Sequence, residues 1–408
     1  MQIYKVGGAV RDELLGLKVV EIDWVVVGAT SKQMLELGYQ QVGKNFPVFL
    51  HPETKEEYAL ARTEKKIASG HTGFSIDANP NVTLEEDLSR RDLTINAIAR
   101  DAGGRLIDPY GGIDDLNQGL LKHVSHAFVE DPLRVLRVAR FHAKLHHLNF
   151  TIADETFEIM KAISGSGELE TLQEERIWRE FEKGLTEPSP HKFIETLYRC
   201  NALEVLIPSL DQRWHHADNM REVIEKIGER TLAALSYAAK TNASGAVRWA
   251  ICCHGLAQDL QPKNIASQKV HDAKNVGLEV ERLCKKMHTP NEHARIATLS
   301  AKYIMLIMQA KAARPDAIVQ LLDACDAWRK PEQFGLLLQV AESLLATHSG
   351  QAKNGAASIT FLRQSLSACQ KINAREFVNN GLQGEAVGAA IANARKIIVA
   401  DLKKQFNH

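Results

Sequence analysis

The sequence predicts an α+β fold, in which a mixed sheet with helices is followed by domains built only from helices. Short apolar and β-branched runs occur in the N-terminal part, at residues 24–27, 47–50 and 57–61, and such runs are sparse after it. Paired glycines punctuate the same part, at residues 7–8, 103–104 and 111–112. After about Glu130 the chain is rich in Ala, Leu, Glu, Lys and Arg, which predicts helices throughout.

Length and composition restrict the classes of protein. A chain of 408 residues is too long for one ordinary core, so at least two domains are expected. A hydrophobic share of 45% and a charged share of 25% are typical of a soluble globular protein. The formal net charge is zero, so any contact with nucleic acid must come from a local basic patch.

The cysteines argue against a disulfide framework or a zinc site. All six lie at or after residue 200 and none forms a C-x-x-C pair. No stretch reaches the roughly 18 uncharged apolar residues that a membrane helix needs, and the N-terminus carries no long apolar run. These features favour a protein of the reducing cytoplasm.

Prolines mark three expected helix boundaries in the helical part. They lie within residues 187–190, at Pro208 and at Pro331. Proline ends a helix or occupies its first turn, because it lacks the N–H that a helix interior needs.

The first polar cluster spans residues 6–12, where Gly7 and Gly8 precede Arg11 and Asp12. Paired glycines before a helix allow the backbone to approach a phosphate, and the free N–H groups of the helix start attract anions. Arg11 would add a charged donor for a triphosphate. Taken alone, the pattern fits an ordinary turn equally well.

Glu21 and Asp23 precede the valine run, two residues apart. On a strand this spacing points both carboxylates to one face. A bound divalent cation is a common reason for two acids to be held together. Such ions, Mg²⁺ or alternatively Mn²⁺, would stabilise the attacking and leaving oxygens of an in-line displacement. The alternative is a pair of solvated acids at a strand edge.

The second cluster, residues 86–97, is densely polar and then becomes apolar. Arg91 could bind phosphate, while Asp92 and Asn96 could bind the ribose hydroxyls. An N-capped amphipathic helix with its charged first turn in water is the alternative, and it accounts for Glu86 and Arg90.

The third cluster, residues 130–141, contains Arg134, Arg137 and Arg140 at intervals of three. That spacing places them on one slowly drifting face of a helix, which Pro132 would begin. The face could meet a polyphosphate, although a solvated face is commoner for arginine rows.

Together these clusters resemble the class II tRNA nucleotidyltransferases, the bacterial and eukaryotic CCA-adding enzymes. The motifs occur in the family's order: G-G-x-V-R-D, a carboxylate pair before valines, R-R-D-x-T-I-N-A and E-D-P-x-R-x-x-R. The match covers about residues 1–185, including residues 172–178, and is weaker beyond, where residues 326–331 resemble the proteobacterial branch.

The resemblance implies a polymerase-β-like palm followed by all-α neck, body and tail domains, at residues 1–130, 131–205, 206–330 and 331–408. It implies addition of CMP and AMP to the 3′ end of tRNA from CTP and ATP. Asp131 and Arg134 would act as an amino-acid template for the incoming base. The expected catalytic and metal-binding residues are Glu21 and Asp23. The expected nucleotide-binding residues are Gly8, Arg11, Arg91, Asp92, Asn96, Asp131, Arg134, Arg137 and Arg140.

The chain departs from the family pattern at two places. Related bacterial enzymes often carry a metal-dependent HD phosphohydrolase body, but Gly255 follows His254 where that site needs Asp. Residues 229–232 also lack an expected helix histidine, so we expect a body domain without hydrolase activity. At the metal site, Glu21 stands where Asp is usual.

Two other functions compete with CCA addition. Bacterial poly(A) polymerases share the palm, but the sequence Leu-Thr-Ile-Asn at residues 93–96 and the long segment from Arg62 to Leu84 favour CCA addition. In this family a loop of that region serves the switch from C to A addition. An enzyme that adds only the terminal A remains an alternative function. The second competitor is an impaired paralogue that binds tRNA without catalysis, suggested by Glu21 and by the altered metal site of the body domain.

Overall fold

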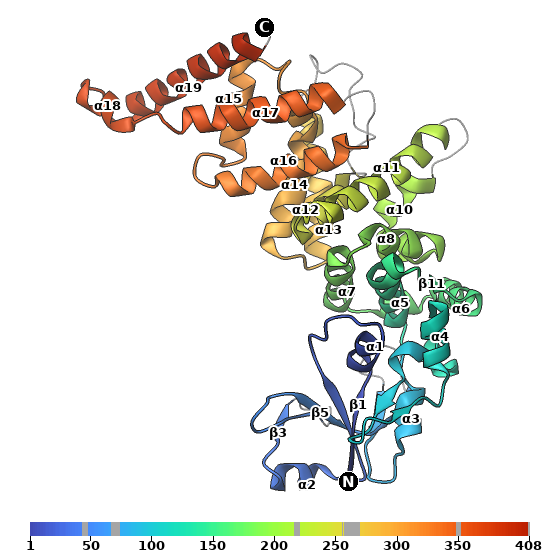
Figure 1. Ribbon diagram of the computed structural model, residues 1–408. Coiled ribbons are helices and arrows are strands. Elements are labelled where there is room, and N and C mark those ends of the chain that lie inside the picture. Colours follow the sequence, from blue (N-terminus) through green and yellow to red (C-terminus); the bar gives the residue numbers. More distant parts are fainter. Residues whose placement is uncertain are drawn as a thin grey trace. The chain divides into compact units, whose positions relative to one another are not determined.

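The computed structural model describes residues 1–42, 48–66, 74–215, 221–254, 256, 270–347 and 352–406. The chain divides into two compact units, Met1–Leu206 and Ile207–His408. Each unit is described by itself, with the element labels of Figure 1. The four-domain division stays a prediction.

The first unit contains a mixed seven-stranded sheet, as predicted. Its strand order is β3-β4-β5-β2-β1-β8-β9. β2 and β5 pair in parallel, whereas the other neighbours are antiparallel. The bounds are β1 Gln2–Val6, β2 Asp23–Val27, β3 Gln40–Val42, β4 Val48–Leu50, β5 Glu57–Leu60, β8 Ala99–Arg100 and β9 Leu106–Ile107. The three apolar runs of the sequence are β2, β4 and β5.

β2 lies inside the sheet because its residues are apolar on both faces. Val25 and Val26 point to opposite faces and are 2% and 1% exposed. Val25 packs with Val6 and Leu88, and Val26 packs in the second cluster with Met34 and Phe49. Because β2 is packed on both faces, the position of its first residue, Asp23, is well fixed.

The remaining head elements are short helices and one hairpin. Thr83 caps α3, and its side chain and that of Glu86 form a capping box. Strands β6 and β7 pair antiparallel, and residues 67–73, part of the predicted switching segment, lie outside the described residues. The bounds are α1 Gly8–Leu14, α2 Ser31–Glu36, α3 Leu84–Ser89, α4 Gly112–Gln118, η1 Thr94–Asn96, η2 His126–Glu130, β6 Thr63–Lys66 and β7 Phe74–Asp77.

The rest of the first unit is helical except for one strand, which the sequence did not predict. β11 (Thr151–Ile152) pairs in parallel with β10 (Leu120–Leu121). This extended segment satisfies its backbone groups there, since Thr151 N donates to Gly119 O and Ala153 N to Leu121 O. The bounds of the helices are α5 Leu133–Leu145, η3 His146–Leu148, α6 Asp154–Gly165, η4 Glu168–Thr171, α7 Glu174–Thr186, α8 Pro190–Arg199 and α9 Ala202–Leu206.

The second unit is helical in all its described elements. The three predicted boundaries, one in the first unit and two in the second, are confirmed, because α8 begins at Pro190, α10 at Pro208 and α16 at Pro331. The bounds are α10 Pro208–His215, α11 Arg221–Lys240, α12 Gly245–His254, α13 Val270–Lys286, α14 Asn291–Met308, α15 Pro315–Ala324, α16 Pro331–Leu345, α17 Ala352–Cys369, α18 Ala374–Asn379 and α19 Glu385–Phe406.

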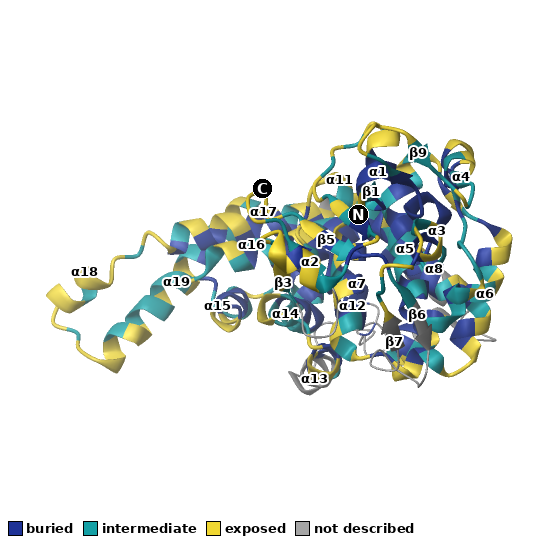
Figure 2. Cartoon of the chain, turned by 90° about the horizontal axis from the view of Figure 1, so that it is seen from below, coloured by how far each residue is buried: buried dark blue, intermediate teal, exposed yellow. Residues whose placement is uncertain are grey.

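Exposure varies strongly between the elements. α5 has eight buried residues among thirteen, and α1 and α5 are largely dark in Figure 2, whereas α18 has no buried residue. The six cysteines are all free and buried. No helix among the described residues is long and apolar enough to cross a membrane.

Candidate active site

The first predicted cluster forms a turn that needs glycine. Gly7 precedes α1 with a φ of 70°, where side chains other than glycine are strained. A Cβ on Gly7 would lie 2.7 Å from Nη1 of Arg91. Gly7 therefore lets the guanidinium of Arg91 cross close to the backbone at the start of α1.

The carboxylate pair lies beside this turn. β2 begins at Asp23, so Glu21 precedes the strand and the expectation that both acids share one strand is wrong. Both side chains nevertheless line the same cavity. Burial raises the pKa of Asp23, the nearby charge of Arg91 lowers it, and the charge of Glu21 raises it.

The donor set fits a divalent cation bound together with a nucleotide. Mg²⁺ usually takes one or two carboxylates, with waters and substrate phosphates completing its shell. The charge of Glu21 raises the pKa of Asp23, and a cation between the two acids would relieve this repulsion. Among the described residues no cluster of three or more metal-binding side chains occurs.

The second cluster is joined to the first and third by a chain of hydrogen bonds. Nη1 of Arg11 donates to Oδ1 of Asn96 at 2.6 Å, and Nδ2 of Asn96 donates to Oδ1 of Asp92 at 2.9 Å. Oδ2 of Asp92 accepts from Nε and Nη2 of Arg137 at 2.7 and 2.6 Å. This chain connects α1, η1 and α5.

Asp92 is a buried carboxylate held by Arg137 and Asn96. Burial by itself would raise its pKa, but Arg137 and the hydrogen bond from Asn96 hold the pKa well below its usual range. The charge of Asp92 in turn raises the pKa of Arg137. The contacts described for Asp92 and Asn96 fix arginines, and binding of the ribose by these two side chains stays a prediction.

Buried Asp87 fixes the next two arginines. Its carboxylate lies 2.9 Å from Arg90 and 3.5 Å from Arg91, and its side chain is fully buried. Arg90 was attributed to a solvated helix turn, and that interpretation is wrong because its side chain is only 17% exposed and lines the cavity. The acid and its two cations anchor the end of α3.

The three predicted arginines of α5 line one cavity. Arg140 binds Glu180 of α7 at 2.7 Å and approaches Glu187 at 3.8 Å. Arg134 donates to the carbonyl oxygens of Ala127 and Arg90. The three arginines of α5 are therefore bound to protein groups, and the alternative of a freely solvated face is wrong.

Asp131 lies just before α5, next to Arg134 in the cavity lining. Its Oδ1 accepts from the backbone N of Leu133 at 3.1 Å, and its Oδ2 accepts from Arg176 of α7 at 3.2 Å. Each carboxylate oxygen has a second lone pair. The side chain is therefore oriented while it keeps acceptor capacity.

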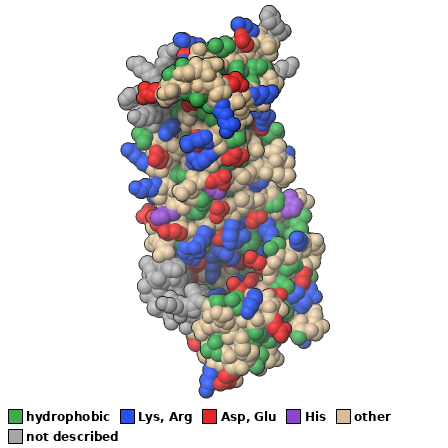
Figure 3. All heavy atoms as spheres, turned by 90° about the vertical axis from the view of Figure 1, so that its left-hand side faces the viewer, with side chains coloured by type: hydrophobic (Ala, Val, Ile, Leu, Met, Phe, Trp, Pro, Cys, Tyr) green, Lys and Arg blue, Asp and Glu red, His purple; other side chains and the backbone are tan. Residues whose placement is uncertain are grey.

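All eleven predicted site residues line a single cavity of about 600 Å³ in the first unit. Its lining contains ten Lys or Arg side chains and only four carboxylates, although the whole chain is neutral. Figure 3 shows Lys and Arg side chains gathered around a hollow on this face. The cavity suits a polyanion.

Several lining residues were not predicted as site residues: Arg62, Arg90, Leu133, Phe141, Lys144, Arg176 and Lys183. Lys144 continues the row of Arg137 and Arg140 at helical spacing, and Lys183 lies seven residues beyond Arg176, so periodicity could have found both. No comparable signal marks Arg62.

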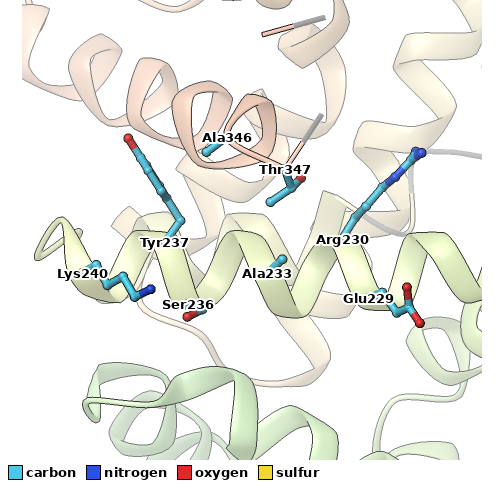
Figure 4. A pocket seen from close by; sticks show the side chains of 8 residues that line it. All are labelled: Glu229, Arg230, Ala233, Ser236, Tyr237, Lys240, Ala346 and Thr347. Carbon is cyan, nitrogen blue, oxygen red and sulfur yellow. The ribbon is translucent and has the colours of Figure 1, made fainter. Parts of the chain in front are cut away.

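The residues at which we expect the body domain to lack a metal site lie in α11 and at the end of α12. Gly255 lies outside the described residues. Glu229 and Arg230 line a pocket of about 570 Å³ between α11 and the end of α16 (Figure 4). Glu229 is the only acid among the lining residues described, and none is His or Cys.

Fold and cavity together define a nucleotidyltransferase, with a mixed-sheet head and a carboxylate pair beside a basic cavity. The family profile "Poly A polymerase head domain" matches residues 3–122, and "Probable RNA and SrmB- binding site of polymerase A" matches residues 149–213. The "Multifunctional CCA protein" of Thioalkalivibrio sulfidiphilus is 45% identical over 408 residues, which is 100% of both chains. The chain belongs to the family of class II CCA-adding enzymes.

Solved structures agree with this fold. A CCA-adding enzyme in its apo form II has a TM-score of 0.67 at 21% identity, covering 98% of this chain and 88% of its own. The Thermotoga maritima CCA-adding enzyme, solved in complex with tRNA, has a TM-score of 0.65 at 19% identity, with coverages of 99% and 91%. The predicted fold class, a nucleotidyltransferase palm followed by helical domains, is confirmed.

Proposed function

We propose that this protein adds CMP and AMP to the 3′ end of tRNA, using CTP and ATP and releasing pyrophosphate. One observation carries the proposal: a single basic cavity is lined by the carboxylate pair, the glycine turn and the Asp131–Arg134 pair. Chemistry, phosphate binding and base recognition thus meet in one place. The relative that is 45% identical over its full length supports the same activity.

In each step the 3′ hydroxyl of the RNA attacks the α-phosphorus, a new phosphodiester forms and pyrophosphate leaves. Such a reaction depends mainly on positioning and charge stabilisation, because the protein supplies no covalent intermediate. Glu21 and Asp23 would hold Mg²⁺, or Mn²⁺ as an alternative, which neutralises developing charge when bound. The arginines fixed by Asp92, Asn96 and Asp87 supply preorganised donors.

Base choice follows from the donors and acceptors that Asp131 and Arg134 present. A carboxylate only accepts and a guanidinium only donates. Cytosine and adenine both offer an exocyclic amine beside a ring nitrogen acceptor, so both fit the pair. Uracil and guanine place a carbonyl oxygen where the amine should be, which leaves Asp131 facing an acceptor. Sites of this kind can reject the wrong base by roughly 10⁴-fold.

The surroundings of the reaction are also proposed. The buried, free cysteines are consistent with a reducing cytoplasm. The body domain would act as a scaffold without hydrolase activity, because Arg230 stands near the position of an expected ligand and would repel a cation.

The test supplies tRNAs that end before, within and after CCA, together with each nucleoside triphosphate and Mg²⁺. Addition of C, C and A in order, with no addition to complete tRNA, is expected. Repeated A addition to any end would identify a poly(A) polymerase, and addition of the terminal A alone an A-adding enzyme. Binding of tRNA without any extension would identify an impaired paralogue.

A further inference from the structure

Three arginines of the cavity surround one phenylalanine. Phe141 lies in α5, lines the cavity and is 5% exposed. The guanidinium carbons of Arg11, Arg137 and Arg140 lie 5.1, 5.8 and 4.6 Å from its ring centroid. Arg11 comes from α1 in the head, while the other two precede Phe141 by four residues and by one.

Each of these guanidiniums is also held by a carboxylate. Arg11 lies 2.7 Å from Asp12. Arg137 and Arg140 lie 2.6 and 2.7 Å from Asp92 and Glu180, respectively. Every cation therefore has an acid and an aromatic ring as neighbours, and the ring is common to all three.

The shared ring would offset the electrostatic repulsion between the three guanidiniums. Three guanidiniums crowded together repel one another, and a polyanion must find them already in place. An aromatic face carries partial negative charge and attracts a cation within about 6 Å. The ring accepts no conventional hydrogen bond, so the guanidinium N–H groups that are not bound to protein oxygens stay available for a ligand.

We propose that Phe141 is a positioning residue that holds Arg11, Arg137 and Arg140 in place for the triphosphate of the incoming nucleotide. The assignment rests on the proposed function. Arg11 follows the glycine turn beside the carboxylate pair, where the phosphates must lie. The triphosphate is the part that CTP and ATP share, whereas Arg134 is the arginine assigned to the base. Phe141 thus acts equally on CTP and ATP.

Three variants test the role of the ring. Phe141→Leu keeps an apolar side chain but removes the ring, and Phe141→Tyr keeps the ring. Phe150→Leu removes another buried ring of the same unit, 2% exposed and outside the cavity lining. Steady-state addition to tRNA ending in C or CC gives kcat and KM, calorimetry gives the Kd of CTP and ATP, and thermal unfolding gives Tm.

We expect Phe141→Leu to raise the KM and Kd of CTP and ATP by the same factor, about 10-fold, with kcat and the KM of tRNA within about 3-fold of the parent. Tenfold corresponds to about 1.4 kcal/mol, comparable to one partly desolvated cation–π contact. Phe141→Tyr should restore parental values. Phe150→Leu should lower Tm and leave nucleotide affinity unchanged.

Unchanged nucleotide affinity in Phe141→Leu would overturn the proposal, as would an equal loss in Phe141→Tyr or in Phe150→Leu. Calorimetry separates this outcome from a failure of the proposed function. A parent that binds CTP and ATP but extends no tRNA refutes CCA addition, and the affinity of Phe141→Leu still decides the role of the ring. A parent that binds neither nucleotide overturns both.

Discussion

Replacing Glu21 by Asp should make the enzyme faster. Glu21 supplies one of the two carboxylates beside the glycine turn, and Asp is the usual residue of the family at this place. The extra methylene of Glu moves the carboxylate by roughly 1–1.5 Å, and a misplacement of about 1 Å can cost on the order of 10²-fold in rate. That factor corresponds to about 2.7 kcal/mol of transition-state stabilisation.

The structure reduces the expected gain. The ladder of β2 with β1 begins at Asp23, so position 21 lies ahead of the paired residues. Its backbone can shift, and the additional torsion of Glu can fold the carboxylate back. We therefore expect Glu21→Asp to raise the single-turnover rate about 10-fold, with tRNA affinity unchanged. Asp23 is fixed opposite Val6, so the matched variant Asp23→Glu should lose about 100-fold.

Single-turnover addition would be measured under Mg²⁺ and under Mn²⁺ for the parent, Glu21→Asp, Glu21→Ala and Asp23→Glu. Electron paramagnetic resonance of bound Mn²⁺, with an unreactive CTP analogue, gives metal affinity independently of turnover. The parent should favour Mn²⁺, whose geometric demands are weaker than those of Mg²⁺. Equal rates and equal Mn²⁺ affinities in the parent, Glu21→Asp and Glu21→Ala would refute a metal-binding role for residue 21.

Three further predictions concern base choice, the body domain and stability. Asp131→Ala and Arg134→Ala should each lose selectivity for C and A and lower the rate at least 10-fold, with nearly parental tRNA affinity; parental nucleotide incorporation by both would contradict the template assignment. The purified protein should not hydrolyse 2′,3′-cyclic nucleotides with Ni²⁺ or Mn²⁺, and metal-stimulated hydrolysis would show that the body site is functional. Burial, together with nearby His146 and Lys192, lowers the pKa of His142 to about 4. Because the unfolded chain binds this proton more readily, stability should be fully present above about pH 6.5 and fall by up to about 3 kcal/mol towards pH 4. His142→Gln should flatten that part of the pH profile of the unfolding free energy, and an unchanged slope would exclude His142 as its source.

The motifs that are local in sequence were predictable. Glycines before a helix, arginines at intervals of three and prolines at helix starts each express a short-range rule of backbone geometry. The eleven site residues could be selected because four such motifs occurred in the family's order. Their convergence on one cavity then follows from the fold.

The partners of these residues were not predictable, because they depend on contacts between distant segments. Arg11 and Asn96 are 85 residues apart, and nothing in either segment specifies their hydrogen bond. Nothing in the sequence distinguishes Phe141 from an ordinary core residue of an amphipathic helix. Its contact with Arg11 is visible only once α1 and α5 are placed together. The start of β2 at Asp23 was missed because a two-residue spacing does not reveal where a ladder begins.

The contacts between α5 and the head also limit how the protein can change its preference from C to A. Buried Asp92 binds Arg137 at 2.6 Å, and Asp12 binds Lys144 at 2.9 Å. A hinge that opened between α5, which carries Arg134, and the head segments that carry Asp12 and Asp92 would separate both pairs. Losing a buried partner typically costs about 3–5 kcal/mol. Opening such a hinge for every added nucleotide would cost this free energy each time. We therefore expect the change of specificity to occur through small rearrangements of side chains and RNA inside a rigid cavity.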